Sequence, residues 1–232
     1  LSVGFDAGAT QRSIDFQSAI WPEQITFEGI DPTRSSQEPA VFDDQFIFFD
    51  MSAGLMWFSV IDEYNNFYIG GAFHHLNTPN VTFYRNTEVD PNFEEVDEAL
   101  YSRYTVHAGG EFQLADRFSL VPGAVMFLQG PSTMINAGTS ARFLLGSQRF
   151  SHQSFQLGAW VRMANRFDSS NLLMDAFILS TRLDYDRFGI GFSYDINVSD
   201  LRPATSSNGA FEFSLNYKIC GPERRGVYCP NF

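Results

Sequence analysis

Alternation of apolar and polar residues with a period of two runs through most of this chain and constrains its fold more than any other feature. In residues 187–198, for example, Phe192 and Tyr194 alternate with Ser193 and Asp195. Successive side chains of a β-strand point to opposite faces, so such a segment presents one apolar and one polar face. The pattern predicts ten strands, with an ambiguous phase only in the eighth: 1–14, 46–60, 67–77, 102–114, 117–129, 134–146, 154–164, 172–183, 187–198 and 209–219.

These strands are long enough to cross a bilayer, which takes roughly 9–11 tilted residues, whereas strands of soluble proteins average roughly 5–6 residues. No stretch approaches the roughly 20 uninterrupted apolar residues of a transmembrane helix. Only helices and closed barrels satisfy all backbone hydrogen-bonding groups in lipid. The sequence therefore predicts an all-β fold, a transmembrane antiparallel β-barrel of the bacterial outer membrane.

The lengths of the connections support this topology. If the last strand ends in the periplasm, short turns at 61–66, 115–116, 147–153 and 184–186 fall on the periplasmic side. Both long connections, 15–45 and 78–101, then fall outside, as in barrels with short periplasmic turns and longer outer loops. We expect residues 1–219 to form the barrel and 220–232 to form a periplasmic C-terminal tail.

The two long loops are rich in Pro, Asp, Glu, Asn and Ser, and loops of this length are often functional. The acidic run at 94–98 is expected to form a short helix. One interpretation of the loops is a solvated surface; the other is a docking surface for a partner. The aromatic candidates for partner contact are Trp21, Phe27, Phe83, Tyr84 and Phe93.

The ionisable residues do not form a pattern typical of catalysis or metal binding. His107 and Glu111 fall on one face of one strand, as a polar ladder would place them. A barrel enzyme would draw on His75 with Ser52 or Ser59, but nothing in the sequence orients them as base and nucleophile. We predict no catalytic, cofactor or metal site. The net charge of −12 argues against nucleic acid as a partner.

Charged residues on the polar faces of the strands are balanced in sign, which favours a lumen held by charge pairs over a selectivity filter. Trp160 also lies on a polar face. The basic members are Arg12, Arg103, Arg142, Arg162, Arg187 and Arg202, and the acidic members are Asp6, Asp50, Glu111, Asp195 and Glu212.

Two features concern the ends of the sequence. Cys220 and Cys229 either form one disulfide in an oxidising periplasm or remain free thiols. Leu1 begins inside a strand pattern, so we expect a targeting segment upstream.

Several motifs together resemble the PorP/SprF family of the Bacteroidetes type IX secretion system and gliding machinery, over the whole of residues 1–232. The motifs include Gln-Arg-Ser-Ile-Asp-Phe at 11–16, Gly-Gly-Ala-Phe-His-His-Leu-Asn at 70–77, and Arg-Tyr-Thr-Val-His-Ala-Gly-Gly at 103–110. Others are Gly-Phe-Ser-Tyr-Asp-Ile-Asn-Val-Ser at 191–199, Leu-Arg-Pro-Ala at 201–204 and Cys-Pro-Asn-Phe at 229–232.

This resemblance implies a multi-pass outer-membrane protein, without enzymatic activity or cofactor, that works in protein secretion and gliding. The implied partners are periplasmic ring lipoproteins, motor-linked proteins and a large secreted adhesin with a C-terminal secretion domain. Membrane lipid and lipopolysaccharide would surround the barrel. The resemblance also implies further strands upstream of Leu1.

We expect the periplasmic tail to dock to the periplasmic machinery through Arg224, Arg225 and Phe232. Two rival functions stay open at this point. A passive outer-membrane solute channel predicts conductance by the purified protein alone, and a lipid-acting barrel enzyme predicts loss of activity on His75→Ala.

Overall fold

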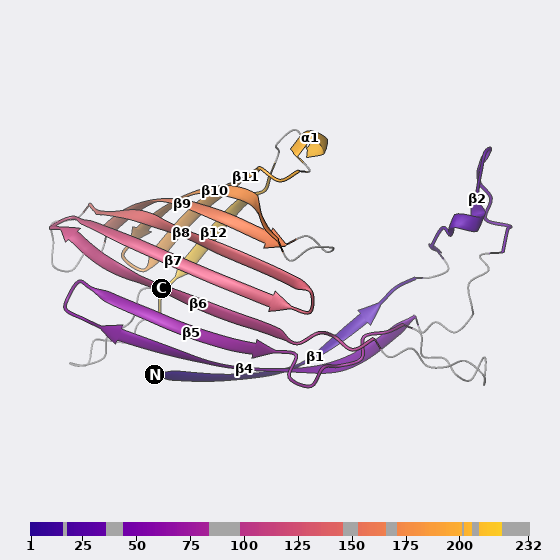
Figure 1. Ribbon diagram of the computed structural model, residues 1–232, viewed down its shortest axis with the longest axis horizontal. Helices are drawn as coiled ribbons and strands as arrows, with labels where there is room; N and C mark the ends of the chain where they lie inside the picture. The colour runs from indigo at the N-terminus through magenta and orange to yellow at the C-terminus, as the bar shows by residue number, and fades with distance from the viewer. Residues whose placement is uncertain are drawn as a thin grey trace. The chain divides into compact units, whose positions relative to one another are not determined.

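The computed structural model describes residues 1–15, 18–35, 44–83, 98–145, 153–165, 171–200, 202–205 and 209–219. All ten predicted strands are present within this part of the chain (Figure 1). They are β1 (Ser2–Ser13), β4 (Gln45–Val60), β5 (Asn66–His74), β6 (Arg103–Ala115), β7 (Phe118–Gln129), β8 (Ser132–Leu144), β9 (Gln153–Asn165), β10 (Leu172–Tyr185), β11 (Phe188–Asn197) and β12 (Phe211–Tyr217).

The ten strands form one sheet in which each strand neighbours the next one along the chain, in the order β1-β4-β5-β6-β7-β8-β9-β10-β11-β12. The pairs from β7 to β12 are antiparallel. The all-β fold predicted from the alternation is therefore confirmed. No helix in the described ranges is long and apolar enough to cross a membrane.

Four short elements were not predicted. A 3-10 turn η2 (Pro22–Gln24) precedes a two-stranded hairpin of β2 (Ile25–Thr26) and β3 (Gly29–Ile30) inside the first long loop. A single helical turn, α1 (Arg202–Thr205), precedes the last strand. Segments of two to four residues are too short for a periodic pattern to reveal them.

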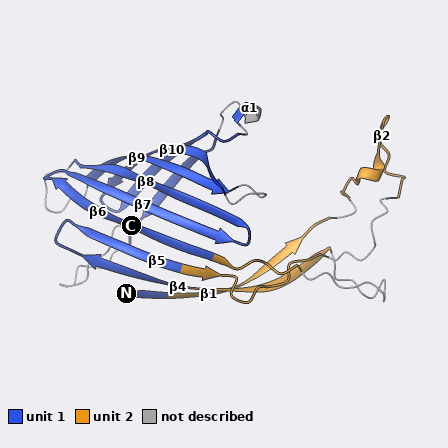
Figure 2. Ribbon diagram, viewed as in Figure 1, with its two compact units in different colours: residues 1–3, 55–71, 104–232 blue, residues 4–54, 72–103 orange. Residues whose placement is uncertain are grey.

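The chain divides into two compact units, coloured separately in Figure 2. Unit 1 comprises residues 1–3, 55–71 and 104–232, and unit 2 comprises residues 4–54 and 72–103. Unit 1 thus contains β7 to β12 complete and nearly all of β6. Unit 2 contains most of β1 and β4 and the described parts of both long loops.

Burial in unit 1 is the reverse of that in a soluble sheet. Ser140 and Asp195 are 6% and 4% exposed, whereas Leu179 and Phe192 are 48% and 45% exposed. Among the described residues of both units, the only buried apolar side chains are Phe46, Ala176 and Pro79. A sheet that buries its polar side chains and exposes its apolar ones suits an apolar solvent rather than water.

The strand register separates these two faces. Ser140, Gly158, Ser180 and Ser193 lie opposite one another on adjacent strands and belong to what we call the polar face. The next row belongs to the apolar face and contains Ala141, Leu157, Thr181, Phe192 and Phe213.

A β-bulge at Asp175 explains the ambiguous phase of the eighth predicted strand. Met174 pairs with Met163, whereas Ala176 already pairs with Arg162, so one extra residue lies between them. An extra residue reverses the alternation on either side of it. The apolar run Leu172–Met174 and the alternating run after Asp175 therefore follow different phases. Asp175 is the inserted residue and has no partner in the register with β9.

Candidate functional site

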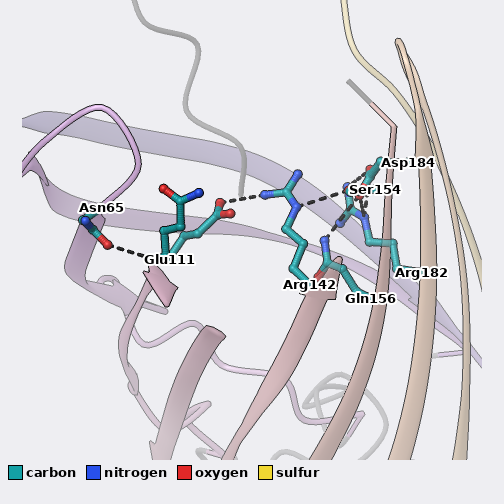
Figure 3. Close-up of polar contacts among 8 residues, drawn as sticks. Asn65, Glu111, Arg142, Ser154, Gln156, Arg182 and Asp184 are labelled. Atoms are coloured by element: carbon teal, nitrogen blue, oxygen red, sulfur yellow. Dashed lines mark hydrogen bonds and ion pairs between the residues drawn. The ribbon is translucent and has the colours of Figure 1, made fainter. Parts of the chain in front are cut away.

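The polar face of unit 1 carries a network of charged side chains near the ends of β6, β8, β9 and β10 (Figure 3). Arg142 Nη1 lies 2.6 Å from Glu111 Oε2, and both side chains are largely buried. Arg142 Nε also donates to Ser154 Oγ at 3.2 Å. One guanidinium thereby links β6 to β9 across β8.

Asp184 forms the second half of this network. Its carboxylate, on a side chain that is 7% exposed, accepts hydrogen bonds from Arg182 Nε at 3.1 Å and Nη2 at 2.9 Å. Ser154 Oγ and Gln156 Nε2 each donate to Asp184 Oδ2 at 3.3 Å. Four donor atoms of three side chains therefore surround a carboxylate that water scarcely reaches. A buried charge requires such hydrogen-bonding partners. We call these six residues the Arg142 cluster: Glu111, Arg142, Ser154, Gln156, Arg182 and Asp184.

A second cluster lies toward the opposite ends of the strands. Arg162 of β9 donates through Nε to the bulge residue Asp175 at 2.7 Å. Its Nη2 lies 2.7 Å from Asp195 of β11, whose side chain is 6% exposed. One guanidinium thus bridges two carboxylates through separate nitrogens, which its planar array of five N–H donors allows. These three residues are the Arg162 cluster.

Between the clusters, Trp160 lies close to glycines of the neighbouring strands. A Cβ at Gly138 would fall 2.7 Å from the indole, and one at Gly123 would fall 3.2 Å from it. Trp160 Nε1 donates to Ser180 Oγ at 3.1 Å, and a Cβ at Gly158 would also meet the indole nitrogen. The prediction that Trp160 occupies the polar face is confirmed, and the glycines explain how so large a side chain fits there.

Tyr68 and His107 repeat this arrangement on β5 and β6, with ring centroids 5.8 Å apart. A Cβ at Gly70 would fall 2.7 Å from the His107 ring, and one at Gly109 would clash with the Tyr68 hydroxyl. His107 therefore contacts an aromatic ring and a glycine, while Glu111 on the same strand pairs with Arg142.

In unit 2, two histidines fasten the end of β5 to β4. His75 Nδ1 lies 2.8 Å from Asp50 Oδ2, and His74 Nδ1 lies 3.2 Å from Ser52 Oγ. The structure thus pairs His74, not His75, with Ser52. The carboxylate and the hydroxyl contact different imidazoles, so these four residues do not form the Ser-His-Asp relay of a hydrolase.

The side chain of the neighbouring Asn77 forms hydrogen bonds with the backbone of β4, as a paired strand would. Asn77 Nδ2 donates to the Phe49 carbonyl at 2.7 Å, and its Oδ1 accepts from the Met51 amide at 3.2 Å. His75 has φ 58°, a left-handed conformation that turns the chain out of the strand.

Farther along, Thr82 is fully buried and Val81 donates to the Glu98 carbonyl, so both ends of the second long loop are held at its root.

The predicted aromatic contacts of the loops have different surroundings. Phe27 is fully exposed at the tip of the β2–β3 hairpin, and Trp21, at the start of the η2 turn, is half-buried. Phe83 packs edge-on against Phe46 at 4.9 Å between ring centroids. The remaining predicted site residues lie outside the described part of the chain: Tyr84, Phe93, Cys220, Arg224, Arg225, Cys229 and Phe232.

Sequence reasoning identified Arg142, Arg162, Glu111 and Asp195 as members of the charge network, and the structure pairs them. It missed Arg182, Asp184 and Asp175, because the phase of their strand could not be read through the bulge. Arg187 lies in an exposed turn rather than on the polar face. The described residues contain no group of three or more His, Cys, Asp or Glu side chains placed to hold a metal ion.

Comparison with known proteins identifies the family to which these features belong. The profile of the family described as "Type IX secretion system membrane protein PorP/SprF" matches residues 1–217 of the 232. No curated protein and no solved structure matches the chain. The match spans every strand of the sheet, from β1 to β12. The chain therefore belongs to the PorP/SprF family of type IX secretion system membrane proteins.

Proposed function

We propose that this protein is a non-enzymatic outer-membrane component of type IX secretion that helps to export or anchor large surface adhesins. The carrying observation is the reversed burial of β8 to β11, with exposed apolar side chains on one face and buried, charge-paired ones on the other. Closed into a barrel, such a sheet presents its apolar face to lipid. The charge pairs on the other face restrain the strands and favour a rigid support over a solute pathway.

The lengths of the connections support an orientation with the long loops outside and the C-terminus in the periplasm. Short connections join β4 to β5, β6 to β7, β8 to β9 and β10 to β11. The long connections, from β1 to β4 and from β5 to β6, fall at the other end of an up-and-down sheet. In outer-membrane barrels the longer loops are extracellular. The loops would then contact secreted cargo, and the tail 220–232 would contact periplasmic ring and motor proteins.

Affinity purification from the native membrane tests this function. The tagged protein is extracted in mild detergent from actively secreting cells, and its co-purifying proteins are identified by mass spectrometry. We expect periplasmic ring lipoproteins and a large secreted adhesin. A chain lacking residues 221–232 should keep its heat-modifiable folded band on gels but lose the periplasmic partners.

One outcome would contradict the proposed function, and a second would contradict only the role of the tail. Recovery of the barrel alone, together with conductance in liposomes, would assign a solute channel. Unchanged partners and secretion after the tail deletion would remove the tail from the proposal while leaving the loops in it.

A further inference from the structure

The described segment 18–35 of the first long loop, which we call the loop knob, exposes most of its apolar side chains. Phe27 at its tip has a relative exposure of 114%, and Ile20, Ile25 and Ile30 are 55%, 61% and 57% exposed. These side chains follow no alternation with a buried polar face. An exposed apolar cluster of this kind typically marks a contact surface.

Hydrogen bonds within the loop knob hold its backbone, and four of them involve Gln24. The Gln24 side chain accepts from the Trp21 amide at 3.1 Å and donates to the Arg34 carbonyl at 3.1 Å. Its backbone donates to Trp21 and accepts from Asp31, at 2.9 and 2.8 Å. One residue therefore joins the start, the hairpin and the end of the knob, so its apolar side chains are displayed by a structured backbone.

The tip of the hairpin is fixed in the same way. Thr26 Oγ1 donates to the Gly29 carbonyl at 2.8 Å and accepts from the Glu28 amide at 3.2 Å. Gly29 has φ 126°, a conformation that other residues rarely adopt. Phe27 is therefore presented by a turn whose shape is already set, which reduces the entropy lost when a contact forms.

The charge of the knob is negative. Residues 18–35 contain Glu23, Glu28 and Asp31 against Arg34 alone, which gives a net charge of −2 from three acids and one base. The hydroxyl and the backbone N–H of Thr33 hold the pKa of Asp31 below its ordinary range, so this carboxylate is ionised at neutral pH. Acidic groups beside an apolar tip oppose insertion among the anionic phosphates of a lipid surface.

We propose that the loop knob is a protein-docking surface that inserts Phe27 into an apolar pocket rimmed by Lys and Arg on its partner. The proposal rests on the proposed function, which places this loop where exported proteins pass. An aromatic anchor in a desolvated pocket contributes much of the binding energy of an interface, and rim charges steer the encounter. The carboxylates of Glu23 and Glu28 would face the basic rim.

Photocrosslinking in the native membrane tests the docking surface. Benzoylphenylalanine replaces Ile30 in the full-length protein, and a control places it at Tyr64, which is 54% exposed in the β4–β5 turn. We expect a protein adduct from position 30 that is absent at position 64. Mass spectrometry should map the adduct to an apolar site flanked by Lys or Arg.

Second substitutions in the position-30 chain then test Phe27 and the charges. Phe27→Ser should lower adduct yield at limiting partner by roughly 30-fold, the effect of removing a hot-spot side chain, whereas Phe27→Tyr should retain it. The double change Glu23→Lys and Glu28→Lys should lower the yield, and added salt should lower the yield of the unchanged knob.

Any of four results would overturn the proposal: adducts with lipid or lipopolysaccharide alone, an unchanged adduct yield with Phe27→Ser, a crosslinked site without basic neighbours, or no adduct. The affinity purification separates this failure from that of the proposed function. If secretion components co-purify while Phe27→Ser leaves the adduct unchanged, only the docking proposal fails.

Discussion

The sheet of unit 1 and the loop knob both expose apolar side chains, but they do so in opposite contexts. In β10, Leu179 is exposed on the apolar face. On the opposite, polar face, Asp184 and Asp195 are buried and paired. In the knob, exposed Phe27 has acidic side chains beside it and no such face behind it. Exposure alone therefore does not define a surface: the sheet is suited to lipid, and the knob to a protein in water.

The largest expected effect comes from breaking the Arg162 cluster. Arg162→Met leaves Asp195 buried without its partner and should destabilise the barrel by about 3–5 kcal/mol. The double variant Arg162→Met with Asp195→Asn should recover part of this loss, because no unpaired charge then remains. Denaturant unfolding in detergent measures both. A single variant as stable as the wild type would show that the polar face does not depend on its charge pairs.

A matched pair of glycine substitutions sharpens the contrast between the two regions. At Gly138 a Cβ would collide with the backbone of Ala159, so Gly138→Ala should cost about 1–3 kcal/mol of global stability. At Gly29 nothing lies within 4 Å, and only the positive φ opposes a side chain. Gly29→Ala should therefore leave global unfolding unchanged and alter only hydrogen exchange in the knob. Equal effects of the two substitutions on global unfolding would show that the knob does not unfold independently of the sheet.

The smallest expected effect is a pH dependence of the β4–β5 turn. Asn65 Nδ2 and the Tyr64 amide donate to Asp62 and lower the pKa of this exposed carboxyl. A lowered folded-state pKa stabilises the turn above the ordinary value of 3.8, and this contribution is lost as the pH falls through the lowered pKa. The protection of the Tyr64 and Asn65 amides against hydrogen exchange, taken relative to the intrinsic rate at each pH, should fall on acidification, and Asp62→Asn should remove that dependence.

The sequence was sufficient to predict the strands because each one repeats its pattern over many residues. The segment 187–198 was predicted with its phase, and the structure contains β11 at Phe188–Asn197. The bulge at Asp175 was not predictable, because one inserted residue only blurs a periodicity. Arg182 and Asp184 were missed for this reason, although the same network contains Arg142 and Glu111, which were identified.

Loop structure was predicted least well. The β2–β3 hairpin depends on single contacts of Gln24 and Thr26 with backbone groups, and such contacts leave no repeat in a sequence. Phe27 was a candidate for partner contact because it is aromatic and lies in a long loop. Its full exposure on a hydrogen-bonded turn is information that only the structure supplies.

One pair of substitutions tests whether the apolar face of β8 to β11 contacts lipid. Leu179 and Ile25 are 48% and 61% exposed, so a lysine at either position would be nearly neutral if both faced water. In a bilayer, Leu179→Lys should destabilise the folded protein by about 2–4 kcal/mol in equilibrium unfolding from vesicles, whereas Ile25→Lys should change stability by less than about 0.5 kcal/mol. Small and equal effects of the two lysine substitutions would show that this apolar face does not contact lipid.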